Sequence, residues 1–332
     1  MTFVTMAALK DNLKKSTQNK TFLLPLLLLV ITLSVNFFLQ PKMFDTRVLG
    51  GNLRSYMPLI FLAVAQTFVI INGSIDLAVG AEMSLVAAFL VTRLSETSTL
   101  GEFVLILLAG IGIGMLAGAF NGLAVSYIRL PAFITSYASS YIFGGIALLV
   151  LPRPGGNMPL DLADAYRHAA FLGIPFGIWV IALILIVWSV VRATRYGTFL
   201  YAVGGSEKSA YASGVPVSQN RFVTHMVAGG IAAIAAVFLA LNTGSSDARI
   251  GDAMTLNSVV AVVLGGTLMS GGSGGVAGSI LGVLILSFIR NIVSYTNIST
   301  WIQPLVDATI ILIAIASPGF IRLFHRKEIK AK

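Results

Sequence analysis

The sequence is poor in the residue types that most soluble domains rely on. It contains no cysteine, and only 11% of its 332 residues are charged, whereas a soluble domain carries about 25%. The missing cysteines exclude a disulfide framework and a thiolate metal site. The three histidines, His168, His225 and His325, lack metal-ligand spacing. There is no phosphate-binding glycine loop of the Walker type and no nucleophile–base pair, so we expect neither ATP hydrolysis nor an enzyme.

The sequence is rich in long hydrophobic runs. Hydrophobic residues make up 56% of the chain, without the period-two alternation of barrel strands. A helix needs about 20 apolar residues to cross hydrocarbon, and only helices or closed barrels satisfy their backbone there. The pattern predicts an all-α, polytopic membrane helical bundle of about ten helices, some interrupted by glycine. The predicted spans are 22–39, 57–72, 77–93, 103–125, 131–151, 171–191, 222–241, 256–270, 275–292 and 301–316.

Lysine and arginine mark the expected cytoplasmic ends of these spans. They are concentrated in the tails 1–20 and 317–332 and in the polar loop 193–221. Because basic residues are retained on the cytoplasmic side, we expect both termini to be cytoplasmic and 21–316 to form one transmembrane domain. The first run is long for a signal peptide and is predicted to be retained. The net charge of +9 fits this anchoring and requires no nucleic acid. Residues 152–170 are predicted to be an outer loop, either a docking surface or a solvated connection.

Three short phrases interrupt the apolar runs, and two of them contain glycine. They are Asn72-Gly73-Ser74-Ile75-Asp76-Leu77-Ala78-Val79-Gly80, Leu130-Pro131-Ala132-Phe133-Ile134-Thr135, and Val263-Leu264-Gly265-Gly266-Thr267-Leu268-Met269-Ser270-Gly271-Gly272. In that order, with a polar loop between the second and third, the chain resembles the permease subunit of bacterial ABC importers for ribose-, xylose- and galactose-type sugars. The resemblance runs from about residue 55 to about residue 316.

The resemblance implies several partners. They are a second permease copy, a cytoplasmic ABC ATPase that binds the ATP, a periplasmic or extracellular substrate-binding protein, and the lipid of the bacterial inner membrane. The permease itself needs no cofactor.

The first phrase contains a charged residue close to a span. A charge at the bilayer centre costs about 2.5–3.5 kcal/mol or more unless it is paired, hydrated or near a helix end. Asp76 follows Gly73 and Ser74, so it is predicted to cap the next helix by accepting from free N–H groups. The alternative is that the segment from Asn72 to Gly80 forms a functional break at the pathway or at the cytoplasmic gate. Glu82 stands where this family usually has a small or neutral residue, and it suits the positive end of a helix.

The loop 194–222 contains the signals of a short isolated helix. Ser206 is a good N-cap, Gly214 permits a left-handed closing turn, and Pro216 stops the helix. A helix this short is unstable alone, so it needs a partner surface or is an incidental surface helix. The segment resembles the coupling helix that fits a groove on the ATPase. The residues assigned to this contact are Ser206, Glu207, Lys208, Ser209, Ala210, Tyr211 and Gly214, with Ala210, Tyr211 and Gly214 expected in the groove and Glu207 and Lys208 at its rim.

Further residues are assigned to the gate or pathway. By resemblance, Phe133 and Thr135 belong to a helix that lines the pathway. Gly265 and Gly266 permit a bent, close-packed backbone. Permeases of this family commonly read Glu-Leu-Asp where this chain reads Thr255-Leu256-Asn257, so Asn257 replaces an acid. The order of apolar runs and glycines is similar in Val64–Leu90 and Val259–Leu286, which suggests an internal repeat.

These features favour a transmembrane permease subunit that moves a sugar or sugar-like polyol, driven by a separate ATPase. Two alternatives remain open. One is an ABC permease for branched-chain amino acids or nucleosides. The other is a proton-coupled secondary transporter using Asp76, Glu82 or Asp307.

Overall fold

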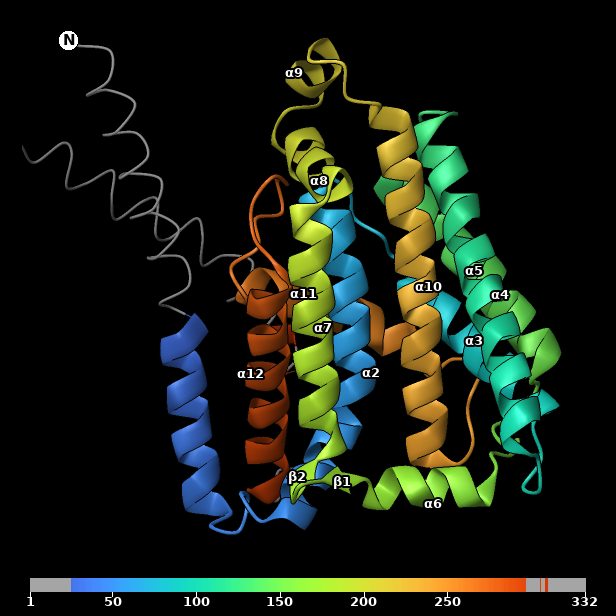
Figure 1. The fold of residues 1–332 in the computed structure, drawn as a ribbon, viewed down its shortest axis with the longest axis vertical. Helices are drawn as coiled ribbons and strands as arrows, with labels where there is room; N and C mark the ends of the chain where they lie inside the picture. Colours follow the sequence, from blue (N-terminus) through green and yellow to red (C-terminus); the bar gives the residue numbers. More distant parts are fainter. Residues whose placement is uncertain (1–24, 297–304, 306–307, 310–332) are drawn as a thin grey trace, which may run out of the picture.

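The computed structural model describes residues 25–296, 305 and 308–309, and over these residues the chain is a helical bundle (Figure 1). Its elements are a first helix Pro25–Leu39, α2 (Thr46–Ile71), α3 (Val79–Arg93), α4 (Leu100–Ser126), α5 (Ala132–Val150), α6 (Leu160–His168), β1 (Ala170–Phe171), β2 (Ile174–Pro175), α7 (Phe176–Ala193), α8 (Arg195–Gly205), α9 (Glu207–Ala212), α10 (Val217–Thr243), α11 (Asp252–Leu264) and α12 (Val276–Tyr295). The predicted all-α class is confirmed for this part of the chain.

Six of these helices are long and apolar enough to cross a membrane, namely α2, α4, α5, α7, α10 and α12. The other predicted spans within the described residues coincide with the shorter helices Pro25–Leu39, α3 and α11, so a count of about ten is not established. The predicted span 301–316, the two tails and Asp307 lie outside the described residues.

Two span boundaries were predicted wrongly. The span 57–72 belongs to a helix that begins at Thr46, where the Asp45 side chain accepts from the Arg47 N–H. Polar residues in the first turns of α2 lower its hydropathy, but they do not prevent a helix whose N-terminus is capped. The span 256–270 is helical only as far as Leu264, because the glycine-rich residues 265–275 form a turn instead.

The two longest buried helices, α2 and α10, pack against each other at the centre of the bundle. Each is followed by a non-helical break, residues 72–78 or 244–251, and then by a short helix, α3 or α11. α10 packs along α3 and α4, and α2 packs in the same way along α11 and α12. In this contact pattern α2–α3 corresponds to α10–α11, whereas the predicted repeat pairs α2–α3 with α11–α12.

The N-termini of α3 and α11 meet inside the bundle. Gly80 and Gly251 approach so closely that a Cβ on either would overlap the carbonyl of the other. The Gly80 N–H donates to Thr255 Oγ1 (3.2 Å), and the Gly251 N–H donates to Ser84 Oγ (2.9 Å). Each short helix thus supplies a hydroxyl acceptor for the first turn of the other.

The two ends of the bundle differ in structure. At one end α8 continues from α7 and leads to α9; at the other, α6 and the β1–β2 hairpin lie across the helix ends (Figure 1). The predicted outer loop 152–170 therefore contains a helix. Sequence hydropathy misses α6 because it is short and polar on one face, with only Ala163 and Tyr166 buried.

Candidate functional site: a broken-helix polar core and a half-open cavity

The break between α2 and α3 is built around Asp76, whose side chain is completely buried. One carboxylate oxygen accepts from the Ala78 N–H (2.8 Å), immediately before α3, and the other lies 3.0 Å from His225 Nδ1 of α10. The Gln66 amide, oriented to satisfy both bonds, donates to the Asp76 carbonyl (3.1 Å) and accepts from its N–H (3.3 Å). The predicted cap is wrong, because Asp76 bonds to the N–H of Ala78, the residue before α3, and α3 has no side-chain cap. The second carboxylate oxygen of Asp76 contacts a different helix, α10.

Glu82 begins a second polar chain. It is fully buried one turn into α3, and its Oε1 accepts from Asn121 Nδ2 of α4 (3.1 Å). The Asn121 carbonyl in turn accepts from Ser139 of α5 (2.5 Å). Among the described residues, none forms a hydrogen bond with Glu82 Oε2. Since buried polar groups are costly in lipid unless they are paired inward, these contacts fix the positions of α3, α4 and α5 relative to each other.

A third cluster lies at the end of α2 nearest α8 and α9. Asn72 Nδ2 donates to Asn220 Oδ1 (2.6 Å), and the Thr224 hydroxyl bonds with the Tyr196 hydroxyl (3.0 Å). Burial raises the pKa of Tyr196 to about 12, against a smaller opposing effect of its bond to Thr224, so the phenol remains protonated. The break is thereby joined to α10 and α8.

Three glycine segments meet beside this cluster. Gly73 lies against Gly204 at the end of α8 and against Gly271 of the 265–275 turn. A Cβ on Gly204 would overlap the Ile71 carbonyl, and the Gly272 N–H donates to that carbonyl (2.9 Å). Gly73 and Gly271 have positive φ values of 83°, which glycine adopts without strain. We call this contact the glycine junction, and it brings the first phrase, the third phrase and the end of α8 into direct backbone contact.

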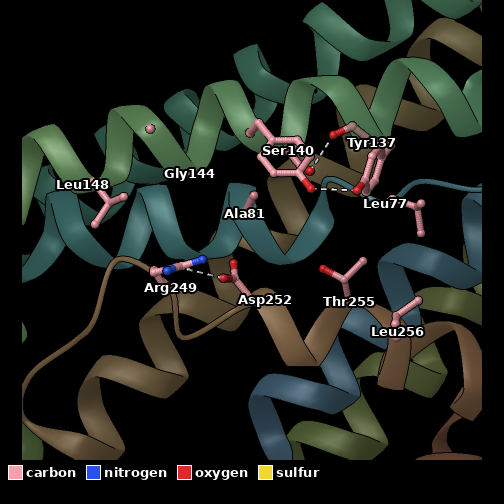
Figure 2. Close-up of a pocket in the computed structure, with 12 residues that line it drawn as sticks. Leu77, Ala81, Tyr137, Ser140, Gly144, Leu148, Arg249, Asp252, Thr255 and Leu256 are labelled. Atoms are coloured by element: carbon pink, nitrogen blue, oxygen red, sulfur yellow. Dashed lines mark hydrogen bonds and ion pairs between the residues drawn. The ribbon is translucent and has the colours of Figure 1, made fainter. Parts of the chain in front are cut away.

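A cavity of about 550 Å³ opens between α5, α3 and α11 (Figure 2). On the α5 wall, Tyr137 and Tyr141 pack edge to face, with their hydroxyls 2.7 Å apart. On the opposite wall, Arg249 Nε lies 3.2 Å from Asp252 Oδ2 (Figure 2). The lining residues are Leu77, Ala81, Tyr137, Ser140, Tyr141, Gly144, Gly145, Leu148, Arg249, Asp252, Thr255 and Leu256. The cavity thus offers aromatic faces and hydroxyls on one side and a closed ion pair on the other.

The predicted helix after Ser206 is present as α9, Glu207–Ala212. Ser206 Oγ accepts from the Ser209 N–H (3.3 Å), and Gly214 has a φ of 80°. The expectation that this helix lacks support within the chain is wrong, because Ala210 is buried against Val203 and Val217. Ala210 therefore cannot also enter a partner's groove while this packing holds.

The outer part of α9 is exposed. The Tyr211 side chain is 76% exposed. Glu207 forms an ion pair with Arg221 of α10 (2.9 Å), so one of the two predicted rim charges is held by the chain itself. Lys208 is exposed, as are Ser209 and Gly214.

Known proteins are similar to this chain in sequence. Residues 49–315 match the family described as "Branched-chain amino acid transport system / permease component". The chain belongs to this permease family. It is 33% identical over 298 residues to the ribose import permease protein RbsC of Bacillus subtilis, covering 88% of this chain and 90% of that protein. It is 28% identical to RbsC of Haemophilus influenzae, with 88% and 91% covered. It is 29% identical to the fructose import permease protein FruG of Bifidobacterium longum, with 85% and 86% covered.

The residues predicted to line the pathway of this permease separate into two groups in the structure. Gly80 and Asp76 lie in the buried core around the break, and Asn72 and Gly73 lie at its α9 end. Phe133 and Thr135 do not line the cavity: the Phe133 side chain is 57% exposed, and the Thr135 hydroxyl bonds to the Pro131 carbonyl (3.0 Å).

Asn257 and the pair Gly265 and Gly266, which were also assigned to the gate or pathway, do not line the cavity. Asn257 is buried, and its amide donates to the Ala253 carbonyl of its own helix (2.6 Å). Gly265 packs against Gly278, while Gly266 has a φ of 88° in the turn after α11. The two glycines shape the 265–275 turn of the permease. Neither they nor Asn257 line the cavity.

The prediction of site residues from the three short phrases did not include the cavity residues of α5. Tyr137, Ser140, Tyr141 and Gly144 follow one another at three- and four-residue spacing, which places them on one helical face. This spacing was available in the sequence of the permease and could have identified the wall. The contact between His225 and Asp76 had no comparable signal, since 149 residues separate them.

Proposed function

We propose that this permease is the membrane subunit of an ATP-binding-cassette importer for a sugar or sugar-like polyol. The observation that carries the proposal is the half-open cavity between α5, α3 and α11, which combines aromatic faces with hydroxyl and ion-pair partners. Tyrosine rings suit the C–H faces of a sugar ring, and neighbouring hydroxyls suit its O–H groups. The relatives that carry ribose and fructose in their names support the same substrate class.

The assembly proposed for this subunit has four kinds of protein or lipid partner. Two permease copies span the bacterial inner membrane, an ABC ATPase docks on the cytoplasmic side at α9, and a substrate-binding protein docks on the outer side at the α6 end. About ten spans, with the last at 301–316 and both tails cytoplasmic, complete the proposed topology. ATP is bound by the partner, and the permease moves its substrate without chemical change.

The coupling contact proposed for α9 is narrower than the sequence suggested. Tyr211 is the exposed aromatic anchor, and aromatic residues are frequent hot spots of protein interfaces. Lys208 and Ser209 border it, while Ser206 and Gly214 fix the two ends of the segment. Glu207 and Ala210 support α9 from within the chain.

The proposed transmission route runs through the glycine junction. A displacement of α9 acts on α8, and Gly204 at the end of α8 lies directly against Gly73 and Gly271. Gly73 lies in the break that contains Asp76 and leads into α3. The break and α3 line the cavity with Leu77 and Ala81, respectively. Movement at the ATPase contact thereby reaches one wall of the cavity along the backbone.

Reconstitution tests the energy source and the substrate class together. The permease is purified with its cognate ATPase and binding protein, placed in proteoliposomes, and offered labelled pentoses, hexoses, nucleosides and branched-chain amino acids. We expect ATP-dependent uptake of a sugar or polyol that is insensitive to a protonophore. Uptake driven by a proton gradient without ATPase would contradict the importer assignment, and uptake only of amino acids or nucleosides would contradict the sugar assignment.

A further inference from the structure

A second cavity, of about 790 Å³, lies at the α9 end of the bundle. It is bounded by the start of the break at Gly73 and Ser74, by the α4–α5 connection and by α9. Its charged lining residues are Arg129, Glu207, Lys208 and Arg221. Lys208 and Tyr211, which the proposed function places at the ATPase contact, lie at its edge, but the proposed transport cycle assigns no small ligand to this space.

The charges around this second cavity are not balanced. Glu207 is paired with Arg221 (2.9 Å). Among the described residues, neither Arg129 nor Lys208 makes an ion pair. Arg129 also has a φ of 63°, a left-handed conformation that is uncommon for a residue with a side chain. Two unpaired cations therefore face a space with one carboxylate already engaged.

Two helix N-termini open onto the same space. α5 begins at Ala132 after Pro131, and α10 begins at Val217 after Pro216; neither has a side-chain cap. Ala132, Val217 and Ser218 line the cavity. The first N–H groups of a helix have no intrahelical acceptor, and together with the helix dipole they favour an anion.

An independent observation comes from Ser126, the last residue of α4. Its side chain is 4% exposed, it lines the cavity, and its hydroxyl has no hydrogen-bond partner among the described residues. A buried hydroxyl without a partner is unfavourable and needs an explanation. The general excess of basic residues on a cytoplasmic face explains neither this hydroxyl nor the two uncapped helices.

We propose that this cavity binds a phosphate group, supplied either by a soluble phosphate ester or by the headgroup of an anionic lipid. Arg129 and Lys208 provide the countercharge, and Ser126 provides a hydroxyl donor. The backbone donors come from the start of α5 and from Ser218 of α10, since the Val217 N–H already bonds to the Val215 carbonyl (2.9 Å). Since the cavity touches α9, the break and the α4–α5 connection, a bound phosphate holds these three segments together and restrains α9.

The first arm of the test uses soluble probes. The full-length chain in nanodiscs of neutral phosphatidylcholine is titrated calorimetrically with inorganic phosphate and glycerol phosphate. We expect saturable binding and slower hydrogen exchange over 206–214. Arg129→Gln and Lys208→Gln should each weaken binding by about tenfold or more, because each removes a charge-assisted contact. Arg195→Gln, which removes an exposed charge at the same end, should leave the affinity unchanged.

Ser126→Ala separates ligand binding from folding. Because its hydroxyl has no partner in the described fold, its removal should leave the melting temperature unchanged and still weaken phosphate binding. A lower melting temperature with unchanged affinity would assign the hydroxyl to an internal contact and contradict its role here.

The second arm distinguishes the sources of the phosphate. Native mass spectrometry of protein from mixed phosphatidylcholine–phosphatidylglycerol discs should show retained phosphatidylglycerol that is lost in Arg129→Gln if the headgroup is the ligand. Binding of soluble probe alone assigns the site to a soluble ester. The proposal is overturned if neither probe nor lipid binds saturably, or if Arg195→Gln reduces binding as much as Arg129→Gln. None of these measurements requires sugar transport, so the outcome is independent of the substrate assignment.

Discussion

Replacement of Asp76 separates its two structural roles. Its Oδ1 accepts from the Ala78 N–H and its Oδ2 lies 3.0 Å from His225 Nδ1, with both side chains completely buried. His225 Nε2 has no partner among the described residues, so the favoured tautomer carries its proton on Nδ1 and donates it to Asp76. Asp76→Asn keeps an acceptor for Ala78 but removes the carboxylate from His225. Asp76→Leu removes both.

These contacts set the expected magnitudes. Loss of the acceptor for the Ala78 N–H costs about 1 kcal/mol, and loss of a hydrogen bond to a charged group costs about 1.5–3 kcal/mol. Asp76→Asn should therefore destabilise the protein by about 1.5–3 kcal/mol and retain much of the transport. Asp76→Leu should cost about 2.5–4 kcal/mol, because it also removes the acceptor for the Ala78 N–H, and it should abolish transport.

The measurements are thermal unfolding of the purified permease in detergent and ATP-driven uptake in proteoliposomes. His225→Asn is the matched control, since it alters the partner and leaves the Ala78 contact intact. If Asp76→Asn were as unstable as Asp76→Leu, the hydrogen bond from the Ala78 N–H to residue 76 would make no separate contribution to stability. If Asp76→Asn folded normally but showed no ATP-driven uptake, the carboxylate charge would act in transport itself.

The remaining predictions address topology, coupling, packing and the cavity. Reporter fusions at the two ends of the chain should both read cytoplasmic, and an external reading at either would refute the proposed topology. Tyr211→Ala should reduce co-purification of the ATPase more than Lys208→Ala does, because a buried aromatic contact outweighs a rim charge; equal effects would remove Tyr211 as the anchor. Gly80→Ala should abolish folded protein because its Cβ would overlap the Gly251 backbone, whereas Gly101→Ala, with nothing within 4 Å, should express normally. Tyr141→Phe should raise the substrate concentration for half-maximal uptake several-fold, as a lost hydroxyl contact of about 1 kcal/mol implies, and unchanged uptake would place the substrate elsewhere.

Local signals in the sequence predicted the local features of the structure. The hydrophobic runs located helices, Ser206 predicted the cap of α9, and Gly214 predicted a left-handed turn, because each of these depends on residues close in the chain. The inward direction of Ala210 was not predictable, since a six-residue helix has no periodicity long enough to define a buried face.

Contacts between distant segments were beyond the sequence signals. Asp76 and His225 meet because α10 packs against the break after α2, and no local pattern encodes that packing. The cavity is a similar case. Its α5 wall follows helical spacing, but the facing Arg249–Asp252 pair comes from the segment after α10 and is placed by the close approach of Gly251 to Gly80.

The glycine junction has a consequence for how tightly the two regions of the molecule are linked. Side chains that separate two segments can change rotamer, and in this way they absorb small displacements of one segment relative to the other. Gly73, Gly204 and Gly271 have no side chains, and a Cβ on Gly204 or Gly271 would overlap neighbouring backbone. A shift of less than an ångström at the end of α8 therefore has no side chain to absorb it before it reaches the segment that carries Asp76. Movement of the end of α8 toward Gly73 and Gly271 is therefore transmitted directly to them, but only while the three backbones remain in contact.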